Sequence, residues 1–545
     1  MDKGEHEDDN EDAVQTVKKL TRVVAAACDS AMPRSGPPRG RGPIYWWNDE
    51  VAQLRKECNH QRRRYERCRG RIAAQMVSEQ YQLARKRLKT AIKASKRAAW
   101  NELRSLADDD PFGKPYKVIM KKIGGPTAES RMEPEDVVKA IDKLFPHHPP
   151  VAASSLNVRV EDVPPISTEE VDAAVERCKT RKWKAPGPDQ IPGAVWCAIH
   201  EAAPSLLTRV FNKVMRGGVY PERWKKARLA LIPKPGQPPD KVRPLCLLDS
   251  LNKLFERVVV DRLSDHLEVK KVLSNSQYGF RTERCTADAA LKLKKIATAA
   301  IKKRQFCAAV SLDIQNAFNS IPWPRIIEAL ENAKVPVYLQ KIIRSYLDCR
   351  FIEAETSAGT VSRKVTCGVP QGSVFGSPLW NVGFDPILRL KLPAGVQLIC
   401  YADDTLVVCT AETVAKVESR VNQVLESLTS WIESVNMKLA VEKTEAVLFT
   451  RRRKFDPPVF RLGGVEVKIG HCLKYLGIWF DGKLSFREHF RRVADKANWK
   501  LGILSALMTN LRGPREVVRQ MYTNVALSVL LYLSLIHISE PTRPY

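Results

Sequence analysis

The sequence predicts an α+β fold with an antiparallel sheet. Short apolar runs with the composition of β-strands alternate with amphipathic helical stretches, and tight turns join some of the runs directly. The helical stretches include LNKLFERVVVDRL (251–263) and VESRVNQVLESLTSWIESV (417–435). The strand-like runs are LALIP (229–233), FCAAVSL (306–312), LICYA (398–402), TLVVC (405–409), AVLFT (446–450) and YLGIWF (475–480). No G-x-G-x-x-G or G-x-x-x-x-G-K-[ST] motif follows a strand-like run, so a dinucleotide fold or a P-loop enzyme has no support.

Charge points to a polyanionic partner. The chain has 545 residues, enough for two or three globular units, and carries 89 Lys and Arg against 61 Asp and Glu, a net charge of +28. An anionic membrane is the rival partner. However, the longest late apolar run (526–536) is too short to span a bilayer, and the acidic start MDKGEHEDDNED is unlike a signal peptide. We therefore expect an intracellular protein with no membrane partner.

Cysteine usage agrees with an intracellular location. The thirteen cysteines are scattered, without a C-x-x-C pair or a histidine at ligand spacing. Reduced structural thiols are the expectation, and a zinc site is not.

The N-terminal part divides by composition. A Pro/Gly/Arg stretch (33–43) suits a linker, so residues 1–45 are interpreted as a linker or remnant. Residues 46–110 are basic, with sparse apolar positions, which predicts a long polar helix or a helix pair. A solvated helix face and contact with phosphates both remain open for its clustered arginines, Arg62, Arg63, Arg64 and Arg67. Residues 111–164 are rich in Pro and Gly and are interpreted as a second linker.

Two adjacent carboxylates, Asp403 and Asp404, occupy the connection between two strand-like runs in YADDTLVV. Aspartate is common in turns, so a polar hairpin turn is the plain interpretation. A second signal changes it, because FCAAVSL also ends in a carboxylate, Asp313. If the two strands are neighbours, the three carboxylates meet at one end of a sheet, and divalent cations would offset their repulsion. Such a cluster predicts Mg²⁺, with Mn²⁺ as the alternative, and two-metal phosphoryl transfer.

An ordered series of motifs carries a family resemblance. LDIQNAF (312–318), GVPQGSVFGSPLW (368–380) and YADD (401–404) resemble the palm motifs of reverse transcriptases, most closely those of non-LTR (LINE-type) retrotransposons. The resemblance covers roughly residues 180–490. It extends to WKAPGPDQIP (183–192), ARLALIPKPG (227–236), VRPLCLLDSLNKLFERVVVDRL (242–263), SQYGFRTERCTADA (276–289), NMKLAVEKTEAVLF (436–449) and KYLGIWFDGKLSFREHF (474–490).

The resemblance implies a right-hand polymerase with fingers, a palm built on the antiparallel sheet, a partial thumb and a basic helical N-terminal extension. Fingers and palm are expected over 165–480 and a partial thumb over 481–534. The tail 535–545 resembles translated adapter sequence and is expected to be non-native. No nuclease-like cluster occurs, so strand nicking is expected to lie outside this chain.

The resemblance also assigns the site. Asp313, Asp403 and Asp404 would be the catalytic carboxylates and metal ligands, with the Ile314 carbonyl as a further ligand. Asp403 is favoured over its neighbour, because adjacent strand residues point in opposite directions. Lys443 matches the family's candidate for protonating pyrophosphate.

Five further residues match the nucleotide-binding positions of the family. Phe318 matches the aromatic gate that excludes a ribose 2′-hydroxyl, although an isolated Phe in an apolar run is more often a core residue. Gln371 and Gly372 lie in the turn beside the nucleotide and template, although a structural turn alone explains the glycine. Lys234 and Arg243 match the basic residues that hold the triphosphate, although each taken alone is more often a surface charge.

The expected function is RNA-directed DNA polymerisation, with an RNA template, a DNA primer or target and dNTPs as partners. A nuclear and cytoplasmic ribonucleoprotein location follows only from the resemblance. A non-catalytic RNA-binding remnant and an RNA-dependent RNA polymerase are the rivals. The aromatic Phe318 speaks against the second of these. The sequence does not determine the oligomeric state.

Overall fold

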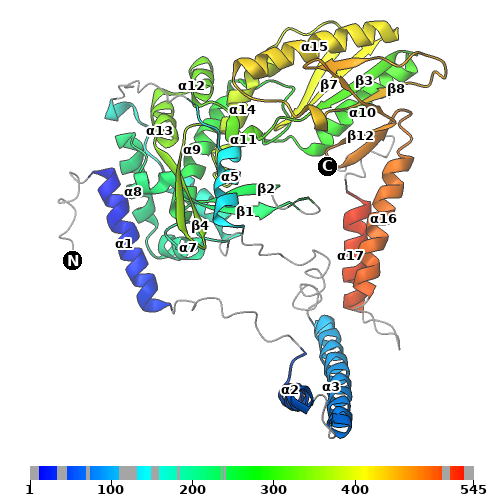
Figure 1. The fold of residues 1–545 in the computed structure, drawn as a ribbon. Coiled ribbons are helices and arrows are strands. Elements are labelled where there is room, and N and C mark those ends of the chain that lie inside the picture. Colours follow the sequence, from blue (N-terminus) through cyan, green and yellow to red (C-terminus); the bar gives the residue numbers. More distant parts are fainter. Residues whose placement is uncertain are drawn as a thin grey trace, which may run out of the picture. The chain divides into compact units, whose positions relative to one another are not determined.

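Segments far apart in the chain combine into two units in the computed structural model (Figure 1). The structure describes residues 12–32, 46–68, 74–109, 132–148, 159–180, 184–234, 237–238, 241–505 and 516–532. The first unit takes 1–32, 129–489 and 535–545, and the second takes 33–128 and 490–534. The stretch 33–43 expected as a linker and the tail 535–545 lie outside the described residues.

The main sheet of the first unit has five strands in the order β11-β8-β3-β7-β6. All neighbours are antiparallel except β11 and β8, which are parallel. The strands are β3 (Phe306–Leu312), β6 (Val396–Tyr401), β7 (Asp404–Ala411), β8 (Glu445–Phe449) and β11 (Ile469–Gly470). The apolar run of β3 fits the centre of this sheet, where its residues are almost all buried. Four of the predicted strands and the α+β class are thereby confirmed.

A second sheet of four strands has the order β2-β1-β4-β5. Its strands are β1 (Lys226–Pro233), β2 (Val242–Leu247), β4 (Arg350–Thr356) and β5 (Gly359–Val365). β1 pairs antiparallel with β2 and parallel with β4. Two small hairpins complete the strands, β9 (Phe460–Leu462) with β10 (Val465–Val467) and β12 (Cys472–Tyr475) with β13 (Ile478–Asp481).

The last hairpin corrects one prediction. YLGIWF was expected to be one strand, but its first residue ends β12 and its last three lie in β13. Leu476 and Gly477 form the turn between them, both with positive φ (48° and 87°). The β-like composition of the run hid a turn whose signal was a single glycine.

Helices cover both sheets of the first unit. Of these, α10 (Thr286–Lys302) and α15 (Val414–Ser434) contact β3 and β7. The others are α6 (Thr168–Lys179), α7 (Gly193–Ala202), α8 (Pro204–Gly217), α9 (Ser250–Val269), α11 (Ala317–Ser320), α12 (Trp323–Asn332), α13 (Val337–Leu347) and α14 (Gly376–Phe384). Short 3₁₀ turns lie at η1 (Val160–Asp162), η2 (Glu222–Lys225), η3 (Asp385–Arg389) and η4 (Val441–Lys443). One apolar core joins most of these helices, and the buried residues of α10, such as Leu293, lie outside it.

Two segments expected to be linkers contain packed helices. Helix α1 (Ala13–Ala31) contacts α8 and buries Val17 in the core. Helix α5 (Pro134–Leu144) buries Val137 and Ile141 and contacts β4. The linker interpretation is therefore wrong for these stretches. It rested on flanking Pro and Gly residues and overlooked the apolar positions at helical spacing.

The second unit is helical. It contains α2 (Asp49–Cys68), α3 (Ala74–Asp109), α17 (Glu516–Leu530) and most of α16 (Arg487–Leu504). Helices α2 and α3 pack along each other, with the rings of Tyr65 and Tyr81 stacked at 6.1 Å. Trp100 of α3 packs against an apolar cluster of α16 and α17 formed by Leu504, Val518, Met521 and Val525.

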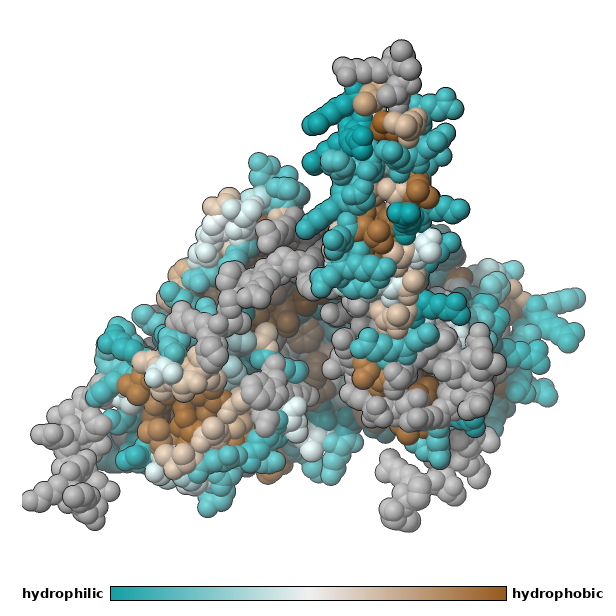
Figure 2. All heavy atoms as spheres, turned by 90° about the horizontal axis from the view of Figure 1, so that it is seen from below, coloured by the Kyte–Doolittle hydropathy of each residue, from teal (hydrophilic) through white to brown (hydrophobic). Residues whose placement is uncertain are grey.

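Hydrophilic residues cover most of the face drawn in Figure 2, and hydrophobic residues gather in smaller areas. Among the helices that the structure describes, none has both the length and the apolarity needed to cross a bilayer.

Candidate active site

The two adjacent aspartates lie in a tight turn between β6 and β7. Tyr401 and Asp404 form the last pair of the ladder, so Ala402 and Asp403 are the two turn residues. Ala402 has a φ of 59°, a left-handed conformation usually left to glycine. A strained backbone of this kind costs free energy, and it persists only where its surroundings hold it in place.

Register places the third aspartate beside this turn. β3 and β7 are antiparallel neighbours, and Leu312 pairs with Thr405. Asp313 follows the first of these residues and Asp404 precedes the second. Paired residues in such a ladder have Cα atoms about 4.5–5.5 Å apart. The three carboxylates therefore lie at one end of one sheet.

A short bridge beyond β3 brings in Lys443. Ile314 pairs with Leu439, through hydrogen bonds from Gln315 N to Lys438 O and from Ala440 N to Asp313 O, each 2.8 Å. Neither of these two hydrogen bonds uses the Ile314 carbonyl. The chain then turns through η4, and Lys443 Nζ lies 2.8 Å from Asp313 Oδ2.

Burial and neighbouring carboxylates raise the pKa of both turn aspartates. Burial, with the Asp313 charge as a smaller cause, raises the pKa of Asp403, which is half-buried. Asp404 keeps more exposed surface, but partial desolvation and the neighbouring Asp403 and Asp313 charges raise its pKa to about 6. Proximity of like charges disfavours ionisation, so this end of the sheet would gain from a bound cation.

Oxygen donors of this kind suit Mg²⁺ in their chemistry. In the part of the chain that the structure describes, however, no three Asp, Glu, His or Cys side chains are close enough together to hold one ion as they stand. Asp313 is instead paired with the Lys443 ammonium. The carboxylate oxygens therefore suit Mg²⁺ in their chemistry, but the side chains do not converge on a single ion position as they stand.

Gln277 holds the strained turn, a role for which there is no local sequence signal. Its side chain is 1% exposed. Its Oε1 accepts hydrogen bonds from the Ala402 and Gly279 amides, both 2.9 Å, and its Nε2 donates to Ala402 O at 3.2 Å. The SQYGF segment lies along β6, with Tyr278 N donating to Cys400 O. Both backbone groups of Ala402 are thus fixed by one amide.

The GVPQG loop is fastened on both sides. On one side, Gly368 N donates to Ile321 O, just after α11, at 2.7 Å, and Val369 N donates to Phe318 O of α11 at 2.6 Å. On the other, Cys246 N of β2 donates to Gln371 O at 2.8 Å. Gly372 has a φ of 126°, and a Cβ there would lie 2.3 Å from Cys246 O, so only glycine fits.

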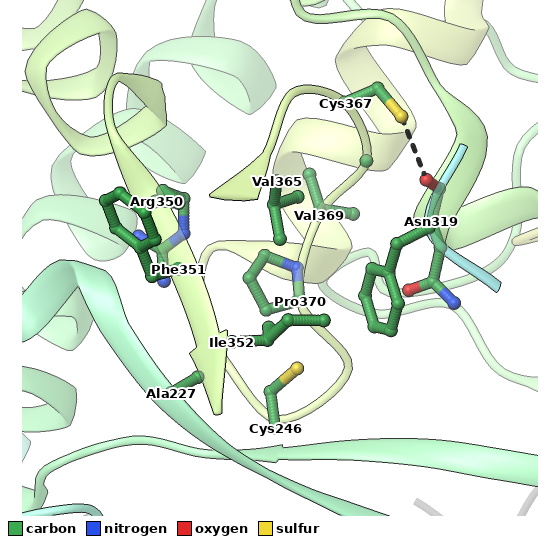
Figure 3. Close-up of a pocket in the computed structure, with 12 residues that line it drawn as sticks. Ala227, Cys246, Asn319, Arg350, Phe351, Ile352, Val365, Cys367, Val369 and Pro370 are labelled. Atoms are coloured by element: carbon green, nitrogen blue, oxygen red, sulfur yellow. Dashed lines mark hydrogen bonds between the residues drawn. The ribbon is translucent and has the colours of Figure 1, made fainter. Parts of the chain in front are cut away.

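A small pocket lies behind this loop. Figure 3 shows Val369 and Pro370 of the loop facing Ile352 and Arg350 of β4, with Cys367 close to Asn319. The Cys367 Sγ is 3.3 Å from the Asn319 carbonyl. These contacts tie the loop to α11 and to the second sheet.

Glu256 of α9, fully buried, supports the residues that follow Gly372. Its Oε2 accepts hydrogen bonds from Ser373 Oγ (2.9 Å) and Val374 N (2.6 Å), and its Oε1 accepts one from Asn252 (3.0 Å). Burial raises the pKa of Glu256, while these bonds and the nearby Arg350 oppose the increase. Sequence reasoning missed this residue, because a glutamate in a predicted helix has no distinguishing local signal.

Phe318 lies beside the carboxylates and is only partly buried. Its ring centroid is 5.1 Å from that of Trp380 and 6.2 Å from that of Phe280, which is 53% exposed. Phe280 in turn lies 6.4 Å from Tyr401 of the turn. The ring therefore belongs to an aromatic cluster that reaches the surface, which is compatible with a gate position and differs from a plain core position.

Lys234 and Arg243 share a face of the β1–β2 hairpin. Ile232 pairs with Arg243, and Lys234 N donates to Lys241 O at 2.9 Å just beyond the strands. Side chains alternate along a strand, so Lys234 lies diagonally across from Arg243 on the face of Ile232. Arg243 is exposed and Lys234 is half-buried.

The four arginines singled out in the sequence lie on α2, in the other unit. Arg62, Arg63, Arg64 and Arg67 are all exposed. One of them, Arg62, forms an i,i+4 ion pair with Glu66 at 3.6 Å. The first unit therefore brings together the carboxylates, Lys443, Phe318, the GVPQG loop and the β1–β2 hairpin, and the arginines form a separate basic surface.

Comparison with known proteins places the chain in context. Residues 232–480 match the family described as reverse transcriptase (RNA-dependent DNA polymerase). The Pol polyprotein of the type-1 retrotransposable element R1 from Bradysia coprophila is 27% identical over 485 residues, which cover 85% of this chain and 47% of that protein. The RNA-directed DNA polymerase of the mobile element jockey from Drosophila melanogaster is 29% identical over 353 residues, 63% of this chain and 38% of that protein.

The chain thus spans less than half the length of these two relatives. Among solved structures, telomerase from Candida albicans covers 64% of this chain and matches over 59% of its own, at 13% identity and a TM-score of 0.35. That likeness is too distant to support any statement about this chain.

Proposed function

Since the chain belongs to the reverse transcriptases of non-LTR retrotransposons of the jockey and R1 type, we propose that it extends a DNA primer along an RNA template, using dNTPs. One observation carries this proposal. Asp313 directly follows the central strand of the sheet, beside the turn that holds Asp403 and Asp404. Carboxylates converging from separate parts of a chain are what two-metal nucleotidyl transfer requires of a protein.

Asp313, Asp403 and Asp404, with the Ile314 carbonyl, are the residues that would hold two Mg²⁺ ions or, as the alternative, Mn²⁺. Bound divalent ions would favour the ionised primer 3′-hydroxyl and stabilise charge on the leaving pyrophosphate. The protein's own part is to hold the oxygen donors at the sheet end. Asp403 is the strongest candidate, because Gln277 fixes the residue directly before it.

Lys443 has two roles in this proposal. Its ammonium lies 2.8 Å from Asp313 Oδ2, where it neutralises part of the local negative charge. An ammonium this close to the reacting centre is also the group that would give a proton to the pyrophosphate leaving group.

The nucleotide would lie between the aspartate end of the main sheet and the β1–β2 hairpin of the second sheet. Lys234 and Arg243, on one face of the β1–β2 hairpin, would bind the triphosphate. Gln371 and Gly372 would line the base and template side, since their loop is held firmly against β2. Phe318 would contact the sugar and exclude a 2′-hydroxyl, because it is a bulky ring backed by Trp380.

Template RNA would contact the basic surface of α2 chiefly through phosphates. The exposed Arg62, Arg63, Arg64 and Arg67 suit such contacts, which lose affinity as salt rises. Localisation in a nuclear and cytoplasmic ribonucleoprotein belongs to the same proposal.

Primer extension tests the proposed activity. An RNA template annealed to a DNA primer, with Mg²⁺, should give dNTP incorporation and little NTP incorporation. Equal use of NTPs would indicate an RNA polymerase. RNA binding without any incorporation by the chain extended to the length of its relatives would indicate a non-catalytic remnant.

A further inference from the structure

A basic pocket lies at the far end of the main sheet from the aspartates. Three separate segments of the first unit line it: the C-terminal half of α10 with the residues before β3, the residues after β8, and the turn after β13. Its volume is ≈ 600 Å³. β3 begins beside the pocket at Phe306 and ends at Leu312, and a strand rises about 3.4 Å per residue, so roughly 20 Å separate the pocket from Asp313.

The pocket concentrates positive charge. Of the eleven described residues that line it, none is acidic, and six are cationic: Lys294, Lys302, Arg304, Arg451, Arg452 and Lys483. Burial lowers the pKa of Lys294. The positive charges of the three segments repel one another, and this repulsion is stronger in a pocket than on a convex surface that water screens. An anion bound in the pocket would offset the repulsion.

The nearest carboxylate of the hairpin is used for another purpose. Asp481, at the end of β13, accepts hydrogen bonds from Lys483 N (3.1 Å), Ser485 N (3.0 Å) and Phe486 N (2.6 Å). These bonds fix the turn that presents Lys483 to the pocket. Asp481 therefore shapes the site rather than forming an ion pair across it.

An exposed aromatic ring adjoins the cations. Phe455, 37% exposed, meets the buried Phe306 edge-on at 5.5 Å. Arg452 packs its guanidinium over the same Phe306 ring at 4.8 Å and donates to Arg304 O at 2.8 Å. A fixed cation near a partly exposed ring is a combination that binds single-stranded nucleic acid, with phosphates on the cations and a base on the ring.

We propose that this pocket binds the phosphodiester backbone of a single-stranded nucleic acid, with a base stacked on Phe455. It is a second nucleic-acid site, distinct from the aspartate end of the sheet. Its six cations would contact phosphates, and its affinity would be salt-dependent. Binding here needs no chemistry, so the proposal does not depend on polymerase activity.

The experiment uses the full chain without nucleotides and two photoreactive probes, a 20-nucleotide oligouridylate containing 4-thiouridine and the matching oligothymidylate containing 4-thiothymidine. The expected result is a crosslink on the tryptic peptide Phe455–Arg461 with one probe or both, and the stronger probe identifies RNA or DNA as the occupant. No crosslink on this peptide from either probe would overturn the proposal.

A charge-reversal variant with a matched control measures the contribution of the cations. Lys302→Glu with Arg451→Glu and Lys483→Glu changes exposed positions of the pocket. Lys270→Glu with Lys271→Glu and Lys391→Glu changes the net charge equally at exposed positions outside it. The pocket variant should lose the crosslink, bind about 10-fold or more weakly at 0.1 M salt, and show a salt slope smaller by about 2 for three lost contacts, whereas the control should change little. Equal losses in both variants would reduce the effect to net charge and overturn the site.

Phe455→Leu tests the stacked base without altering charge. Stacking contributes enough per base that affinity should fall about 5-fold or more, with the salt slope unchanged. Unaltered affinity in this variant would mean that no base stacks on Phe455, and it would overturn the proposed stacking site.

Discussion

Single residues at the aspartate end of the sheet combine strain, charge and close support. Ala402 adopts a positive φ, and the aspartate after it has a raised pKa. Both features cost free energy, and Gln277 fixes the backbone that carries them. Such costs accumulate at functional sites, because the geometry is required there even though it is unfavourable.

Replacing Asp403 by Asn should abolish DNA synthesis, because the amide keeps the shape of the side chain and loses the charge that would hold a metal ion. Binding of template RNA should stay within about 2-fold of wild type, since phosphate contacts come from basic residues. Primer extension and filter binding measure the two effects. Asp265→Asn, at an exposed position, is the matched control, and synthesis near the normal rate by the Asp403 variant would remove this residue from the site.

Gln277→Leu should slow synthesis by about 10-fold or more with a smaller change in the KM for dNTP. The strained turn loses the amide that holds it, while the nucleotide-binding residues are untouched. Gln340→Leu is the control, because Gln340 is also buried, at 8% exposure, and its Nε2 donates only to Val335 O. Both variants should lose about 1–3 kcal/mol of stability from the unpaired backbone groups. Equal kinetic losses in the two would mean a general loss of stability and no positioning role.

Among the elements, the GVPQG loop packs directly against β2, where Cys246 N donates a hydrogen bond to Gln371 O. Gly372→Ala should disturb the loop, because its Cβ would meet the Cys246 carbonyl at 2.3 Å. Gly359→Ala provides a close control, since Gly359 has a similar φ of 122° but no atom within 4 Å of its added Cβ. Both variants should lose about 1 kcal/mol of stability from backbone strain. Only the first should raise the KM for dNTP, and equal kinetics in both would separate this loop from nucleotide binding.

The start of α9 carries a titrating carboxyl pair. Asp249 Oδ1 accepts from Asp189 N at 3.0 Å, and burial and the Asp249 charge raise the pKa of Asp189 to about 7. Between its ordinary value of about 3.9 and that value, the folded protein binds a proton that the unfolded chain releases. Stability from this group is therefore greatest at low pH, falls as pH rises towards about 7, and is level above that.

Asp189→Asn should remove that decline, because an amide supplies the proton that the two carboxylates otherwise share. The melting temperature should rise relative to wild type at pH 8 and differ little at pH 5. Thermal melts across this range, with the exposed Asp162→Asn as control, measure the effect. A constant difference between variant and wild type at all pH values would disprove the shared proton.

At the scale of the whole molecule, the second unit joins the N-terminal helices to the C-terminal ones. Trp100→Ala should loosen α17, because the ring packs against the cluster that contains Met521 and Val525. A buried aromatic truncation costs about 3–5 kcal/mol, and a partly buried one less. Hydrogen exchange of residues 516–530 should then accelerate. Leu83→Ala, on an exposed position of the same helix, should leave it unchanged, and an identical response to both would disprove the contact.

Four of the five strands of the main sheet, and the aspartates at their ends, are predictable from the sequence alone. The apolar runs at 306–312 and 405–409 can be buried on both faces only as central strands. Asp313 follows the first run and Asp404 precedes the second, so antiparallel pairing brings both carboxylates to the same end of the sheet. These signals are local, so composition and order suffice to read them. The same local reasoning failed where a single glycine marked a turn, in YLGIWF, and where Pro and Gly flanked a helix, as in α5.

Which side chains support the site depends on tertiary packing. Gln277 meets Ala402 from 125 residues away, and Glu256 meets Val374 from 118. The basic pocket likewise gathers cations from three separated segments, and Trp100 joins α3 to helices some 400 positions later. Such contacts depend on strand register and on how packed elements meet, and no stretch of sequence read alone contains that information.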